Sequence, residues 1–153
     1  MATLYETDFY AWTQQQSAKL RALFEDRANL DLDLDNLSEE IDSMGRSYRR
    51  ELASRLANLL EHLLKLTYSP SWEPQNVWRG SVRGQRLALR KLMMKNPSLK
   101  PVLPASLDEC YEDALSIFDD IKLAELTMPP LPASCPFDLE TEIMNPDWWP
   151  DAR

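Results

Sequence analysis

The stretch that decides the fold runs from Asp35 to Tyr68, DNLSEEIDSMGRSYRRELASRLANLLEHLLKLTY. Its apolar residues recur at steps of three and four, which is the period of one face of an α-helix. They are Leu37, Ile41, Met44, Tyr48, Leu52, Leu56, Leu59, Leu60, Leu63 and Leu64. Asp35 suits the N-cap, and Tyr68-Ser69-Pro70 ends the helix, because a residue before proline avoids the α region. The stretch predicts one helix about 50 Å long, which needs packing partners along its whole length.

Gly45 lies on the apolar side of this helix. A glycine inside a helix costs about 1 kcal/mol relative to alanine, so its presence needs a reason. Close approach of another helix is the favoured explanation, and a kink or break of the helix near Gly45 is the alternative.

Three further segments show helical periodicity, at about residues 8–28, 76–95 and 106–123. The chain has three glycines and eleven prolines, a balance typical of helices joined by proline-rich connections. Its 153 residues are enough for one domain, residues 1–153, with a sizeable core. We therefore expect an all-α fold, an antiparallel bundle of four main helices. The proline-rich tail after residue 124 ends with Trp148 and Trp149, and we expect it to pack on the bundle because a free tail would expose both rings.

Charge is distributed unevenly along the chain. Residues 1–45 carry a net charge of −7, residues 46–100 carry +9, and residues 101–153 carry −10. This pattern has two explanations: neutralisation inside an antiparallel bundle, or an exposed basic surface for a polyanion. The overall charge of −8 argues against constitutive, tight binding of nucleic acid.

Two polar rows are the candidate site. On the long helix, Glu51, Arg55 and His62 lie on the flank of the apolar face, and His62 is the only histidine. The segment 76–95 carries a row of Arg79, Arg83, Arg86 and Arg90. The short connection between the two helices predicts an antiparallel pair, with Arg79 near His62 and Arg90 near Glu51.

This arrangement has a catalytic and a structural interpretation. In the first, His62 is a general acid or base with Glu51 and Arg55, and the arginines nearest the connection, Arg79, Arg83 and Arg86, bind an anion. In the second, His62 is a hydrogen-bonded structural residue and the arginines are paired to carboxylates. We expect at least one arginine–carboxylate pair between the two helices.

Several kinds of site are not indicated by the sequence. One histidine and the separated Cys110 and Cys135 predict no metal site, and no glycine-rich phosphate loop or nucleophile elbow is present. We expect no cofactor. No apolar run is long enough to span a membrane and no signal-peptide pattern occurs, which predicts a cytoplasmic protein with no membrane partner.

Three blocks of the chain, together with Trp78–Arg86 (WRGSVRGQR), form a combined pattern that can be compared with known families. They are YETDFYAW (Tyr5–Trp12), EEIDSMGRSYRRELASRLANLLEHLLK (Glu39–Lys65) and CPFDLETEIMNPDWWP (Cys135–Pro150). Together they resemble the bacterial family called domain of unknown function 29, over nearly the whole chain. The resemblance implies a compact α-helical bundle, and it implies no activity and no catalytic residue.

Two functions are consistent with these observations. The first is a binding or protein-interaction module without chemistry, whose partner is another protein or a further copy of the chain. The alternative is an RNA-acting or other phosphate-handling enzyme that uses His62 and the arginine row, with nucleic acid as partner. Convergence of His62 and the arginines on an open cleft would favour the enzyme.

Overall fold

The computed structural model describes residues 1–26, 29–69, 75–122 and 130–151, and within them every regular element is a helix. The longer helices are α2 (Phe9–Glu25), α3 (Leu34–Tyr68), α4 (Gln75–Lys95) and α6 (Leu107–Lys122). Shorter turns are α1 (Leu4–Thr7), η1 (Pro97–Leu99), α5 (Val102–Ala105) and η2 (Leu139–Ile143). The all-α prediction is confirmed, with four main helices close to the expected bounds. The first expected helix begins, as α2, directly after Asp8, whose side chain caps it by accepting a hydrogen bond from the Ala11 amide.

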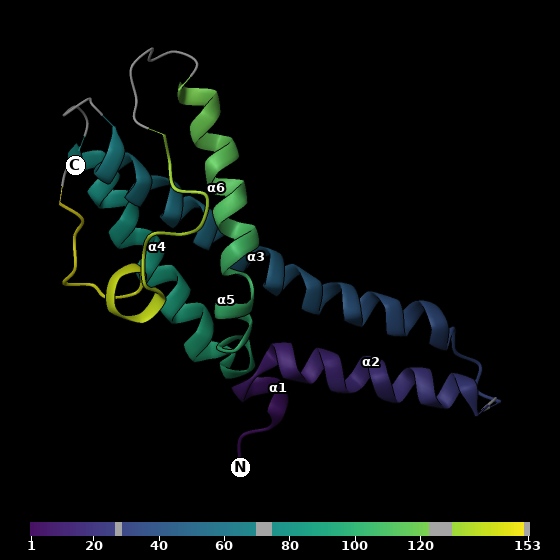
Figure 1. Ribbon diagram of the computed structural model, residues 1–153. Coiled ribbons are helices and arrows are strands. Elements are labelled where there is room, and N and C mark those ends of the chain that lie inside the picture. The colour runs from purple at the N-terminus through teal and green to yellow at the C-terminus, as the bar shows by residue number, and fades with distance from the viewer. Residues whose placement is uncertain (27–28, 70–74, 123–129, 152–153) are drawn as a thin grey trace.

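The four main helices do not form the single bundle that we expected. Helix α3 is the axis of the molecule, and α2 packs on its N-terminal half while α4 and α6 pack on its C-terminal half (Figure 1). We call α2 with residues 34–50 of α3 the arm. We call residues 51–68 of α3, with residues 75–122 and 130–151, the body. The arm projects to one side of the body because α3 is longer than any of its partners (Figure 1).

The body is held together by a leucine-rich core. The second half of α3 buries leucines on more than one side of the helix, because α4 and α6 cover different sides of it. The fully buried side chains there are Leu52, Leu56, Leu59, Leu60, Leu63 and Leu64. They meet Val82 and Leu89 of α4, and Tyr111 and Phe118 of α6. Cys110 is buried among them, and burial raises the pKa of its thiol to about 11, which suits a small apolar residue rather than a nucleophile.

The arm is held together by small residues instead. Thr13, Ser17 and Ser38 are buried between its two helices, and each hydroxyl donates to a carbonyl oxygen of its own helix. A Cβ atom on Gly45 would lie 2.5 Å from Oγ1 of Thr13, so no larger residue fits at the observed spacing. Helix α3 continues through Gly45 without interruption. Close approach of α2, and not a break, is therefore the reason for the glycine.

Polar contacts fix the base of the arm to the body. The Asp8 carboxylate accepts hydrogen bonds from the Ser98 amide and the Ser98 hydroxyl, both at 2.7 Å. The Asn96 side-chain oxygen accepts from the Tyr10 amide at 3.0 Å. Asp8 and Asn96 are both buried. These contacts set the direction in which α2 leaves the body.

Candidate functional site

His62 lies on the body, beside a charged group on its own helix. Its Nδ1 atom is 2.8 Å from the carbonyl oxygen of Asn58 and 3.0 Å from Oε2 of Glu61. Lys65 forms an ion pair with the other oxygen of Glu61, and its ammonium lies over the ring of Trp78. Glu61 is 4% exposed. The histidine is therefore part of a largely covered ion-pair cluster, which sequence reasoning missed because Glu61 is on the buried side of α3.

Both ionisable partners in this cluster have displaced pKa values. The hydrogen bond to Glu61 raises the pKa of His62, and it outweighs the opposing effect of burial. Burial raises the pKa of Glu61, but hydrogen bonds from His62 and Lys65 together outweigh it, so that the pKa lies below its ordinary value. Each shift favours the charged form of its group. Mutual pairing accounts for both shifts without a catalytic role.

The arginine row of α4 contacts the C-terminal tail. The guanidinium of Arg86 donates three hydrogen bonds to backbone oxygens of the tail, at Glu142, Ile143 and Trp148, over 2.7–3.0 Å. The guanidinium carbons of Arg79, Arg83 and Arg86 all lie 5.0–5.2 Å from the centre of the Trp149 ring. We correct the expectation that Arg79 and Arg90 face α3: Arg79 stacks on the tail, and Arg90 lines a pocket with Pro146.

The expected arginine–carboxylate pair between the two helices is also wrong for the part of the chain that the structure describes. Arg55 pairs with Glu51 on its own helix and reaches α4 only through Gln85, at 3.3 Å. Glu51 lines a pocket together with Ala88 and Lys91 of α4, whereas Arg90 lines a different pocket. The candidates His62, Glu51, Arg55, Arg79, Arg83 and Arg86 are thus divided among three separate places. The tail does pack on the body as expected, with Trp148 and Trp149 half-buried against its core.

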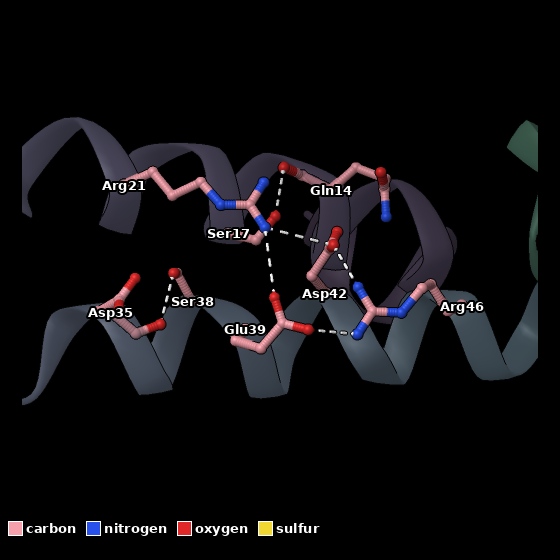
Figure 2. Close-up of polar contacts among 8 residues, drawn as sticks. All are labelled: Gln14, Ser17, Arg21, Asp35, Ser38, Glu39, Asp42 and Arg46. Carbon is pink, nitrogen blue, oxygen red and sulfur yellow. Dashed lines mark hydrogen bonds and ion pairs between the residues drawn. The ribbon is translucent and has the colours of Figure 1, made fainter.

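The arm presents a more distinctive surface, because its two sides differ in chemistry. One side is polar and joined by ion pairs across the two helices (Figure 2). Arg21 of α2 lies 3.3 Å from Asp42 and 3.9 Å from Glu39. Arg46 completes the network with contacts of 2.6 Å to Glu39 and 2.7 Å to Asp42. These four charged side chains are paired with one another within the arm.

The other side of the arm is apolar and open. Helical spacing places Phe9, Trp12, Leu20 and Leu23 of α2 on this flank, with Gln16 among them, and Leu37, Ile41, Met44 and Tyr48 of α3 beside them. A ring contact of 5.4 Å between Phe9 and Tyr48 joins the two rows at the base. Leu23 is 41% exposed, Leu37 41% and Met44 46%. We call these nine residues the apolar face.

Neither a metal site nor a membrane span is visible in the described residues. Within those ranges no three His, Cys, Asp or Glu side chains are grouped so that they could hold a metal ion. No helix there is both long enough and apolar enough to cross a bilayer.

Comparison with known proteins agrees with this all-helical picture. The chain matches the family described as "Domain of unknown function DUF29" over residues 4–149, and it belongs to that family. Its fold is similar to the crystal structure of an α-helical protein of unknown function from Rhodospirillum rubrum. The two are 25% identical with a TM-score of 0.70, over 97% of this chain and 93% of the other. No curated protein matches the chain significantly.

Proposed function

We propose that the protein is a helical interaction module, without catalytic activity of its own, that binds a protein partner through the apolar face of the arm. The observation that carries the proposal is the asymmetry of the arm. On its polar side Arg21 and Arg46 are paired with carboxylates of α3, while its other side carries a row of large apolar side chains, of which Leu23, Leu37 and Met44 are exposed and the others half-buried. A continuous exposed apolar surface bordered by polar residues is typical of a protein–protein contact.

The alternative, an enzyme that acts on RNA or another phosphate compound, has less support. Its proposed base, His62, is paired with Glu61, and its proposed anion-binding residues are engaged by the tail. A catalytic base must reach the proton it abstracts, and an anion site needs donors that are free to receive the anion. The alternative makes its own prediction, which is RNA cleavage that is lost in His62→Ala.

Site-specific photocrosslinking in living cells tests the proposal. A photoreactive amino acid at Leu37, on the apolar face, should give a discrete crosslinked product. The same residue at Ala18, which is exposed on α2 away from the apolar face, should give none. Equal products at the two positions, or none at Leu37, would contradict the proposal. A parallel RNA-cleavage assay of wild type and His62→Ala should show no difference, and activity dependent on His62 would establish the enzyme instead.

A further inference from the structure

The apolar face has an internal symmetry that indicates what covers it. On α2, Trp12 and Leu20 are each four residues from Gln16, and Phe9 and Leu23 are each seven residues from it. On α3, the pairs Ile41 with Met44 and Leu37 with Tyr48 share a midpoint between Asp42 and Ser43. Each row of large apolar residues is therefore symmetric along its own helix.

The two centres of symmetry lie at nearly the same height on the arm. Thr13 faces Gly45, and Phe9 contacts Tyr48. Counting in opposite directions along the two antiparallel helices, Gln16 is level with Asp42 from the first contact and with Ile41 from the second, about one residue from the centre of the α3 row. A single twofold axis that crosses the arm near this level would approximately superpose both rows on copies of themselves. In a closed dimer the same patch of both copies meets, so residues at equal distances on either side of the axis face each other.

From this symmetry we infer that the partner is a second copy of the chain, with the two arms packed face to face and antiparallel into a four-helix bundle. This inference rests on the proposed function and names its partner. The bulky rings near the base of one arm, Phe9, Trp12 and Tyr48, then lie against the aliphatic side chains Leu23, Leu20 and Leu37 of the other. Gln16 lies beside the Gln16 of the second copy, where two amides can exchange hydrogen bonds.

Charge complementarity at the two ends of the arm favours the antiparallel direction. In the sequence, the tip of the arm, residues 25–35, has five carboxylates, Glu25, Asp26, Asp31, Asp33 and Asp35, against one basic residue, Arg27. Leu30 and Leu32 are also exposed there, at 48% and 60%. The tip therefore combines negative charge with exposed leucines.

The base of the arm is complementary to the tip. A pocket of about 600 Å³ opens where the arm meets α4, and its lining includes Phe9, Tyr48, Lys91 and Lys95. The acidic residues of that pocket have partners, since Glu51 pairs with Arg55 and Glu6 bonds to Thr3. Lys91 and Lys95 are exposed and form no ion pair with any described residue. In the antiparallel dimer each acidic tip reaches this basic pocket of the other copy, whereas a parallel dimer would place tip against tip.

Sedimentation of the full chain over a concentration series tests whether the dimer exists. Wild type should pass from monomer to dimer, and Leu23→Arg should weaken the dimer at least tenfold because it places an unpaired charge in the apolar contact. Ala18→Arg, an exposed change of the same kind on α2, should leave dimerisation unchanged. Circular dichroism confirms that each variant is folded. A wild type that is monomeric throughout, or equal behaviour of the two variants, would overturn the inference.

Disulfide trapping tests the symmetry axis. In a Cys135→Ser background, Gln16→Cys should form an intermolecular disulfide on mild oxidation, because the two copies of residue 16 lie beside the axis. Ala18→Cys should not, because it lies outside the face. In a parallel dimer α2 would lie over α3 of the second copy, and Gln16→Cys would not meet itself. Equal trapping at the two positions, or none at residue 16, would contradict the antiparallel arrangement.

Charge exchange tests the contact between tip and pocket. The change Asp31→Lys with Asp35→Lys should weaken the dimer, and so should Lys91→Glu with Lys95→Glu. All four changes in one chain should restore it, because the reversed charges again attract. Independent effects without restoration would overturn the tip contact.

A single result separates the inference from the proposed function. If wild type is monomeric but the photoreactive residue at Leu37 still crosslinks to a protein of different mass, the interaction module stands and self-association fails. If neither contact is found, both fail.

Discussion

The arm and the body use the same long helix in opposite ways. In the body, α3 buries six leucines completely, and its neighbours fill the space between them with aromatic and branched side chains. In the arm, the buried positions of α3 are Leu34, Ser38 and Gly45, and the two small ones lie opposite Thr13 and Ser17 of α2. Apart from Leu34, most large apolar residues of the arm lie to one side of this contact, where they are exposed or half-buried. One helix therefore supplies a dry core at one end and an exposed apolar face at the other.

The difference shows how small residues at a helix–helix contact change the spacing of the two helices and the apolar area that they bury. Small side chains let two helices approach closely, but they bury little apolar area, which contributes about 25 cal/mol per Å². The hairpin of the arm therefore depends on its junction with the body through Asp8 and Asn96, and on whatever covers its apolar face. The body has no such dependence, because its leucines are already buried within the chain.

The largest expected effect tests whether the body depends on its tail. Arg86→Met should lower the free energy of unfolding by about 3 kcal/mol, because three backbone oxygens of the tail lose a charged donor. Arg90→Met, an exposed change one turn later, should stay within about 0.5 kcal/mol of wild type. Urea denaturation followed by tryptophan fluorescence measures both. Equal losses would mean that the tail contributes little to the body.

The next effect tests the close contact within the arm. Gly45→Ala should cost about 1–2 kcal/mol, although alanine is the better helix former, because its Cβ would overlap Thr13 and force the helices apart. Gly84→Ala in α4 is the matched control, since nothing lies within 4 Å of its Cβ, and it should stabilise the protein by up to about 1 kcal/mol.

A double variant decides the cause of the Gly45→Ala effect. Thr13→Ala removes the overlapping hydroxyl, so Gly45→Ala should become nearly neutral in that background. Thermal denaturation of the four proteins gives the coupling between the two positions. An unchanged cost in the double variant would show that the spacing of the arm is not set by this contact.

The smallest expected effect concerns pH and the charged cluster of the body. The folded-state pKa of His62 is raised above its ordinary value of 6.5, so its stabilising contribution is complete below that pH and is lost as pH rises through the folded-state pKa. The folded-state pKa of Glu61 is lowered below 4.5, so its contribution is present above that pH and is lost as pH falls through the lowered pKa.

The free energy of unfolding should therefore be greatest between the ordinary pKa values of the two groups, 4.5 for Glu61 and 6.5 for His62. His62→Gln should remove the decline on the alkaline side and leave the acidic decline in place. Denaturation at a series of pH values measures the pH dependence of stability, and NMR titration of the single histidine measures its pKa in the folded protein. A histidine pKa at or below 6.5 in the folded protein would contradict the pairing with Glu61.

The sequence predicted local structure well, because helix periodicity and proline are local signals. The bounds of α3 and α4 differ from the expected ones by one residue each. The contacts of the candidate side chains were not predicted correctly. The arginine row of α4 was identified as a row, but its direction depends on how α4 is rotated against α3. The buried Arg86 side chain donates hydrogen bonds to backbone oxygens of the tail, which lies more than fifty residues further along the chain. No local pattern contains that information.

The sequence by itself determined that this chain is helical, where its main helices begin and end, and that Gly45 lies on the apolar side of the longest one. Each of these follows from spacing within one segment, since the backbone hydrogen bonds of a helix join residues four positions apart. Only the tertiary structure decided that α2 leaves the body as an arm, that the arginines hold the tail, and that an apolar face stays open. These features depend on which face of each helix meets a neighbour, and that choice is made by contacts between residues distant in the chain.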